Sequence, residues 1–318
     1  MTTALPTLLA IGRSRLLLDS IEHLADEGYP FGVIVTAPES AEYDVDPADF
    51  ERLAGRLGCD YFLTTKAASA EVREAVRRRG VGAGISVNWQ YVLPPSFLDL
   101  FPLALLNLHL GNLPDYKGNA TVNWAILNGE KEIHANIHRM VADLDAGDVL
   151  ARERIPIDEV TYVGDVLAEA TRVAPDLFER ALSSLVEDPG ACVVRGQVEG
   201  LRCYPRLPQD GLIDWTRPAV DVVRLVRASS RPYPGAFSYL GDRRVVVWRA
   251  RVAPTTPFLA VPGHVLGTDP DGTRLRVACG AGAVDLEEVC VDGAPGPAAE
   301  LTRSIRARFS NAASDGAP

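Results

Sequence analysis

The chain has 318 residues, a formal net charge of −10 and an apolar share of 47%, which is ordinary for a globular protein with a sizeable core. It contains no long apolar run, and its first ten residues lack a basic segment followed by an apolar one. We therefore expect no membrane span and no secretory signal. The five cysteines are widely spaced and form no CxxC pair, which argues against a zinc site or a disulfide framework and favours the reducing cytoplasm.

The charge is unevenly distributed along the chain. Residues 203–318 contain 14 arginines and 12 acidic residues, so residues 1–202 hold 18 basic and 30 acidic residues. A first part with a net charge of −12 repels a polyphosphate backbone over a long range. We therefore expect a small-molecule partner and no nucleic acid or membrane partner, and a homodimer is compatible with the sequence.

Residues 7–109 alternate short apolar runs with helical periodicity. Repeated strand–helix–strand units imply a mostly parallel, twisted α/β sheet with helices on both faces. Next come a helix, two strands in antiparallel style, and a long amphipathic helix interrupted near Pro175. The predicted strands are 7–11, 31–35, 61–63, 82–87, 104–109, 133–141 and 149–155, and the predicted helices are 16–27, 47–57, 70–79, 95–100, 121–127 and 162–185.

The stretch 202–210 contains Pro205 and Pro208 and is the best linker candidate. Beyond it, one helix and several short strands predict a small open β-barrel. We expect a first domain at 1–203, a barrel domain at 204–310 and a disordered tail at 311–318. The helix is predicted at 219–229 and the strands at 236–240, 244–252, 264–267, 275–279 and 284–289.

Three polar residues stand out because their chemistry suits acyl transfer. Asn107 and His109 are two apart on a predicted strand, so their side chains share a face at its carboxyl end, where open α/β sheets bind ligands. Asp145 follows 38 residues after Asn107, about the length of a helix and a returning strand. An amide can donate to an oxyanion, an imidazole can move a proton near neutral pH, and a carboxylate can orient that imidazole.

We expect no metal site at the other polar clusters in the sequence. His134 and His138 are four apart, but their segment alternates as a strand, so this is not a helical metal pair. Asp143, Asp145 and Asp148 form an acidic cluster, in which Asp148 more naturally caps a turn. His23 lies in an amphipathic helix as a surface or boundary residue.

At this point the chain resembles the formyltransferases that use N10-formyltetrahydrofolate, and most closely their two-domain members, which act on methionyl-tRNA, amino sugars or hydroxyornithine. The resemblance spans roughly residues 7–290. It rests on Asn107-Leu108-His109, Leu113-Pro114, Tyr116-Lys117-Gly118, 123–130, His138-Arg139-Met140, 144–148, 210–215, 225–228 and 232–237. It implies a Rossmann-like α/β catalytic domain followed by an OB-like open barrel.

The resemblance also implies residue roles. Asn107, His109 and Asp145 would be catalytic, with N10-formyltetrahydrofolate as formyl donor and no metal. Two loops would hold the folate, and a third segment would meet the amine acceptor. The folate residues would be Tyr91, Val92, Leu93, Val141, Ala142, Asp143 and Leu144, and the acceptor residues Gly111, Asn112, Lys117, Asn119 and Asn123.

The segment after His109 departs from the family pattern, which puts the acceptor in doubt. Gly111 and Asn112 replace a usual Ser-Leu pair, and Lys117 replaces a frequent arginine. Gly111 either makes room for a bulkier acceptor or is a neutral turn variant.

Three acceptor classes compete: a nucleotide-linked amino sugar, a modified amino acid, and methionyl-tRNA. The acidic segment 39–46 lacks the charge to hold a tRNA acceptor stem. We expect an amino sugar or a modified amino acid, with methionyl-tRNA formylation or formyl-folate hydrolysis as alternatives.

Overall fold

The structure is a computed structural model that describes residues 4–38, 45–255 and 257–312. Residues 39–44 of the acidic segment and 313–318 of the predicted tail lie outside the described residues. Within the described ranges, no helix has both the length and the apolar composition needed to cross a membrane.

The chain divides into two compact units, and each is described by itself. Unit 1 comprises residues 1–121, 132–156 and 167–204, and unit 2 comprises residues 122–131, 157–166 and 205–318. The two inner stretches of unit 2 have no counterpart in the predicted domain ranges, which stay a prediction.

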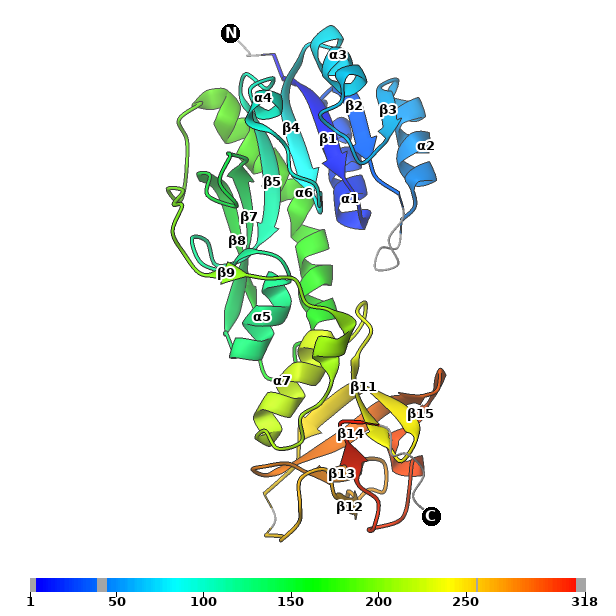
Figure 1. The fold of residues 1–318 in the computed structure, drawn as a ribbon. Helices are drawn as coiled ribbons and strands as arrows, with labels where there is room; N and C mark the ends of the chain where they lie inside the picture. The colour runs from blue at the N-terminus through cyan, green and yellow to red at the C-terminus, as the bar shows by residue number, and fades with distance from the viewer. Residues whose placement is uncertain (1–3, 39–44, 256, 313–318) are drawn as a thin grey trace. The chain divides into compact units, whose positions relative to one another are not determined.

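Unit 1 is built on a seven-stranded sheet of order β3-β2-β1-β4-β5-β7-β8 (Figure 1). The first five strands in this order are parallel, and β7 and β8 run antiparallel to their neighbours, which confirms the predicted mostly parallel sheet with an antiparallel pair. The strands are β1 (Thr7–Gly12), β2 (Phe31–Thr36), β3 (Asp60–Leu63), β4 (Val81–Val87), β5 (Ala104–Leu110), β7 (Glu132–Arg139) and β8 (Val149–Pro156).

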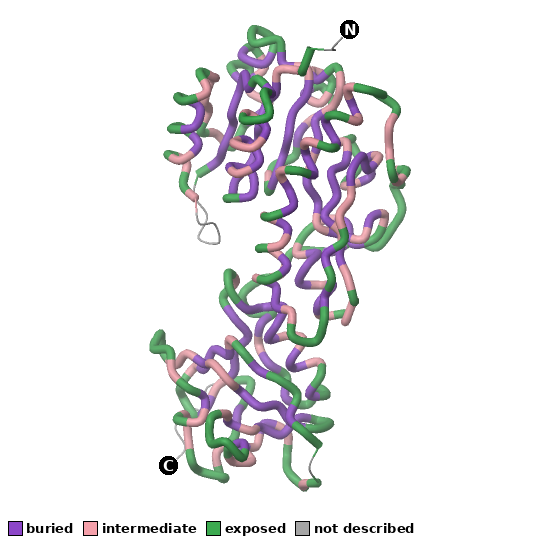
Figure 2. Tube along the Cα trace, turned by 180° about the vertical axis from the view of Figure 1, so that it is seen from behind, coloured by how far each residue is buried: buried purple, intermediate pink, exposed green. Residues whose placement is uncertain are grey.

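Helices cover both faces of this sheet, as predicted. On one face, α3 and α4 pack with alternate residues of β1 and β2 in one apolar cluster. On the opposite face, α1 and α6 lie beside each other (Figure 1). Figure 2 shows the central strands as the continuously buried part of this unit. The helices of unit 1 are α1 (Arg15–Asp26), α2 (Pro47–Leu57), α3 (Ala70–Arg78), α4 (Pro95–Leu98) and most of α6 (Val163–Glu187), whereas α5 (Thr121–Asn128) falls in unit 2 apart from its first residue.

Local sequence explains where these helices begin and end. The Asp46 carboxylate accepts the Asp49 N–H at 3.1 Å, and the Asp49 carboxylate accepts the Asp46 N–H at 2.9 Å. These two bonds cap the start of α2, whose first residue is Pro47, and proline is favoured in the first turn of a helix. Gly58 ends α2 with φ +68°. α3 begins in the same way, because the Ser69 hydroxyl accepts the Val72 N–H at 3.4 Å.

The predicted interruption near Pro175 is wrong, because α6 runs continuously from Val163 to Glu187. Proline removes one backbone hydrogen bond from a helix. The residues around it, Ala174, Leu177 and Phe178, are almost fully buried, and their packing offsets that loss.

Unit 2 is a curled antiparallel half-barrel with one long helix, which agrees with the predicted open barrel. Its strands follow the order β12-β13-β14-β11-β10-β16, with β15 paired to β14. The short strands β15 and β16 were not predicted, since β15 consists of alanine, proline and glycine and β16 has only two residues. The elements are α7 (Ala219–Ser229), β10 (Ala236–Leu240), β11 (Arg243–Val252), β12 (Val265–Thr268), β13 (Leu275–Ala278), β14 (Ala283–Val291), β15 (Ala294–Pro297), β16 (Phe309–Ser310) and 3₁₀ turns at Pro208–Gly211 and Ala298–Glu300.

The predicted linker at 202–210 is only partly irregular. Its first residues form β9 (Arg202–Cys203), which pairs in parallel with β6 (Lys117–Gly118). The 3₁₀ turn at Pro208–Gly211 occupies its end. The β6–β9 pairing matters below, because β6 contains Gly118, whose N–H donates to Asp145.

Candidate active site

Asn107 and His109 lie near the carboxyl end of β5, as predicted. Because side chains alternate along a strand, both share a face with Leu105, which belongs to the apolar cluster under α3 and α4. His109 is 7% exposed. The sheet therefore presents one amide and one imidazole at the edge of a buried apolar layer.

Asp145 returns to these residues on the loop between β7 and β8. Its Oδ2 atom accepts the Gly118 N–H at 2.7 Å and lies 3.4 Å from His109 Nδ1. Asp145 has φ +45°, a left-handed conformation that aspartate tolerates better than most residues. The loop closes tightly after it, because a Cβ on Gly147 would overlap the Arg139 carbonyl group. Backbone geometry thus fixes the carboxylate beside the imidazole.

His138 is a fourth member of this group, to which the sequence analysis gave no role in the site. It lies on β7 directly opposite Asn107. Its Nε2 atom is 3.2 Å from Asn107 Nδ2 and 3.6 Å from Asp145 Oδ1. The available signal was cross-strand pairing, since a strand that returns beside β5 must place some residue opposite Asn107.

The tautomer of His138 follows from its contacts. Its Nδ1 atom is 2.9 Å from the Arg139 carbonyl oxygen, which can only accept, so Nδ1 carries the hydrogen. Nε2 then accepts from the Asn107 amide. One amide N–H of Asn107 is thereby used for orientation, and the other remains for a ligand.

The charge state of His138 is set mainly by burial. Burial lowers its pKa to about 4, although the nearby Asp145 carboxylate acts in the opposite direction. His138 is therefore neutral at physiological pH and stays an acceptor for the amide.

His109 is held by a backbone carbonyl on its other side. Its Nε2 atom donates to the Tyr116 carbonyl oxygen at 2.7 Å. Gly111 lies against this hydrogen bond, where an added Cβ would overlap both His109 Nε2 and the Tyr116 oxygen. Gly111 is therefore required by the packing of the imidazole, and the space beside it is filled.

The two loops predicted to hold a ligand both pack on the apolar cluster that contains Leu105. Leu93 belongs to that cluster, and Trp89 and Met140 pack against it. Beyond these anchors, each loop has exposed apolar side chains, and Val92 is 95% exposed. The Trp89 indole Nε1–H is buried and has no hydrogen-bond partner in the described chain. The exposed apolar or polar loop residues are Tyr91, Val92, Val141, Ala142, Asp143 and Leu144.

The predicted acceptor residues fall into different environments. Lys117 is 3% exposed and donates through Nζ to the carbonyl oxygens of Gln197 and Val198. Asn112 is bonded to the Glu132 carbonyl and to His134 at 3.1 and 2.9 Å. Both side chains are thus used within unit 1, and their contact with an acceptor stays a prediction.

Two predicted acceptor residues remain. Asn123 belongs to unit 2, is 4% exposed, and donates to the Ala228 carbonyl at 2.7 Å. Asn119 is exposed, and no hydrogen bond of its side chain is seen in the described part of the chain. Of the predicted polar side chains, Asn119 is therefore the one best placed to meet a ligand.

Comparison with family sequence models gives two matches. The model described as formyl transferase matches residues 34–182, and the model described as formyl transferase, C-terminal domain, matches residues 207–306. Together they cover most of the chain.

Solved structures with the same fold include HypX from Aquifex aeolicus in complex with tetrahydrofolic acid, at 20% identity and a TM-score of 0.62 over 94% of this chain. This chain spans 47% of HypX, about half its length. An N-formyltransferase from Helicobacter canadensis, bound to folinic acid and dTDP-3-aminofucose, matches at 13% identity and a TM-score of 0.62, over 89% of this chain and 99% of its own. A sugar N-formyltransferase from Shewanella sp. FDAARGOS_354 matches at 18% identity and a TM-score of 0.60, over 80% and 99%.

The His138 environment predicts an unusual titration. In nitrogen-detected NMR of the imidazoles, His138 should remain neutral with its hydrogen on Nδ1 down to about pH 5, because its pKa lies near 4. Asp145→Asn should lower this pKa further, since the carboxylate stabilises the charged ring. Titration of His138 near the ordinary value of 6.5, or a hydrogen on Nε2 at neutral pH, would contradict the assignment.

Proposed function

Because this chain belongs to the formyl transferase family, we propose that it moves a formyl group from N10-formyltetrahydrofolate to the primary amine of a small metabolite. The amine nitrogen bonds to the formyl carbon, and the bond from that carbon to N10 breaks. The amine loses one proton, N10 gains one, and the products are a formamide and tetrahydrofolate. The observation that carries this proposal is the convergence of Asn107, His109 and Asp145 at the end of β5.

Asn107 has the role that depends most on geometry. Its free amide N–H donates to the formyl oxygen as negative charge develops there. His138 holds the amide in this orientation from 3.2 Å, so the donor needs no rearrangement during the reaction. A preorganised donor of this kind contributes roughly 3–4 kcal/mol of transition-state stabilisation.

His109 and Asp145 handle the proton. His109 accepts at Nε2 the proton that the amine loses, after the ring has left the Tyr116 carbonyl and carries its own hydrogen on Nδ1, toward Asp145. Asp145 lies 3.4 Å from Nδ1 and stabilises the resulting cation. The same pair then returns a proton to the departing folate nitrogen.

The folate donor fits the two loops that adjoin these residues. Exposed apolar side chains on both loops, including Tyr91, Val92 and Leu144, suit a flat aromatic ring. The unpaired Trp89 N–H offers one buried donor, and backbone groups of residues 141–144 offer others.

The five cysteines are free thiols, which supports a place in the reducing cytosol.

For the acceptor, we favour a nucleotide-linked amino sugar ahead of a modified amino acid. The net charge of −12 over residues 1–202 opposes a tRNA backbone. The fold extends over almost the whole length of the enzyme that was solved with dTDP-3-aminofucose. The support for an amino sugar comes from the fold and the charge and not from Lys117 and Asn123, because both side chains are used in internal hydrogen bonds.

The acceptor is tested with purified protein, N10-formyltetrahydrofolate and a panel of amines. The panel contains nucleotide-linked amino sugars, hydroxyornithine and methionyl-tRNA at physiological salt, with a sample that lacks any amine. We expect a kcat/KM for at least one amino sugar that exceeds all other acceptors by about tenfold or more, measured by mass spectrometry of the formylated product. Transfer to methionyl-tRNA alone would contradict the acceptor, and amine-independent release of formate would contradict formyl transfer.

Gly111 offers a test of how His109 is positioned. Gly111→Ala places a Cβ where His109 Nε2 meets the Tyr116 carbonyl, so the imidazole must move. We expect kcat to fall by about 100-fold, with little change in KM for the folate. The matched control is Gly55→Ala on the exposed face of α2, where nothing lies within 4 Å of the added Cβ. Equal activity of both variants would show that the imidazole does not depend on this contact.

A further inference from the structure

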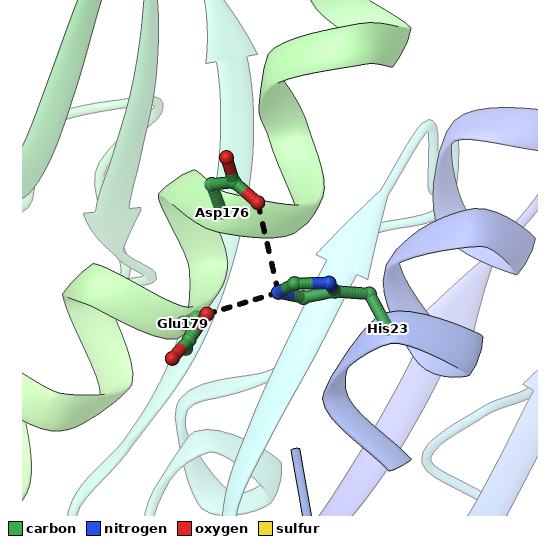
Figure 3. A group of neighbouring side chains, drawn as sticks. All are labelled: His23, Asp176 and Glu179. Atoms are coloured by element: carbon green, nitrogen blue, oxygen red, sulfur yellow. Dashed lines mark hydrogen bonds and ion pairs between the residues drawn. The ribbon is translucent and has the colours of Figure 1, made fainter. Parts of the chain in front are cut away.

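A second group of ligand-type side chains lies in unit 1, on the sheet face opposite to Asn107 and His109. His23 comes from α1, and Asp176 and Glu179 come from α6 (Figure 3). Their nitrogen and oxygen atoms all lie within 4.8 Å of one another. Asp176 and Glu179 are three residues apart, so they share one face of the helix. Figure 3 shows both carboxylates directed at the same ring nitrogen of His23.

The distances suit a metal ion. His23 Nε2 lies 2.9 Å from Glu179 Oε2 and 3.7 Å from Asp176 Oδ1. Tetrahedral zinc with bonds of about 2.1 Å places its ligand atoms about 3.4 Å apart. The observed distances lie on either side of this value, so small side-chain rotations would complete the geometry.

The electrostatics also favour a cation. With a neutral imidazole the group carries two negative charges. In the described chain no lysine or arginine nitrogen lies within 4 Å of either carboxylate, and the nearest cation that acts on Asp176 is Arg172, which pairs with Glu169. The side chains of His23, Glu179 and Asp176 are 27%, 37% and 76% exposed, so an ion can enter the group past Asp176. A ligand set of one imidazole and two carboxylates suits Zn²⁺, whereas Mg²⁺ prefers oxygen ligands alone.

We propose that His23, Asp176 and Glu179 form a zinc-binding site that links α1 to α6. The three side chains leave one coordination position for water. The site is separate from the group around Asn107, and its role is to tie two helices that cover the same face of the sheet.

The test uses the full chain after removal of metals with a chelator, and Zn²⁺ alone as the ligand. Isothermal titration should show one saturable site per chain. His23→Gln and Glu179→Gln should each weaken it by at least about tenfold. The matched control is Glu169→Gln on the same helix, because Glu169 pairs with Arg172 and lies outside the group. This variant should bind like the wild type.

Two further readouts separate a specific site from a folding defect. Co²⁺ in place of zinc should give visible absorption bands with the wild type and with Glu169→Gln, but not with His23→Gln. Zn²⁺ should raise the Tm of the same two proteins, while Mg²⁺ should not. Circular dichroism of His23→Gln should match the wild type. Zinc affinity unchanged in His23→Gln and Glu179→Gln, or no saturable binding by the wild type, would overturn the proposal.

Discussion

The arrangement at the end of β5 depends on the Asp145 carboxylate. One of its oxygens accepts the Gly118 N–H and faces His109, and the other faces His138. The carboxylate is 12% exposed, so its charge must be met by these partners. It therefore connects three segments that are distant in sequence: the end of β5, the β6 loop and β7.

The two imidazoles around this carboxylate differ because their surroundings differ. His138 is buried and hydrogen-bonded through Nδ1 to a carbonyl, which keeps it neutral and makes it an acceptor. His109 points Nδ1 at the carboxylate, so the cation that forms when the ring gains a proton is stabilised. One histidine orients the amide and the other moves a proton. This division of roles is possible because His138 lies on β7 directly opposite Asn107.

Much of this could be predicted from sequence because the signals were local and periodic. The spacing of Asn107 and His109 on an apolar run is sufficient to place both on one face of a strand. The alternation of strands and helices predicted the mostly parallel sheet, and Asp46 with Gly58 marks both ends of α2. Asp145 was proposed from its residue type and its distance of 38 residues from Asn107, and the resemblance to the formyl transferase family supported that choice, since no periodicity could fix its position.

The remainder depends on contacts between distant residues. His138 is important because it lies opposite Asn107, and the sequence does not state which residues pair across strands. Lys117 looks like a ligand for an anionic substrate, yet it is buried against the carbonyl oxygens of residues 197 and 198. From the sequence, Gly111 was either added space or a neutral turn variant, and the structure shows it in close contact with His109. His23 and Glu179 are 156 residues apart, and only the packing of α1 on α6 brings them together.

The most direct test of the central claim is single-turnover transfer of a labelled formyl group in variants of the β5 group. Asn107→Ala, His109→Ala and Asp145→Ala should each slow transfer by at least about 100-fold, with circular dichroism and folate binding close to the wild type. The double variant Asn107→Ala/His109→Ala should be little slower than the worse single variant, because the residues act as one unit. Near wild-type transfer by His109→Ala, with any amine, would contradict the account.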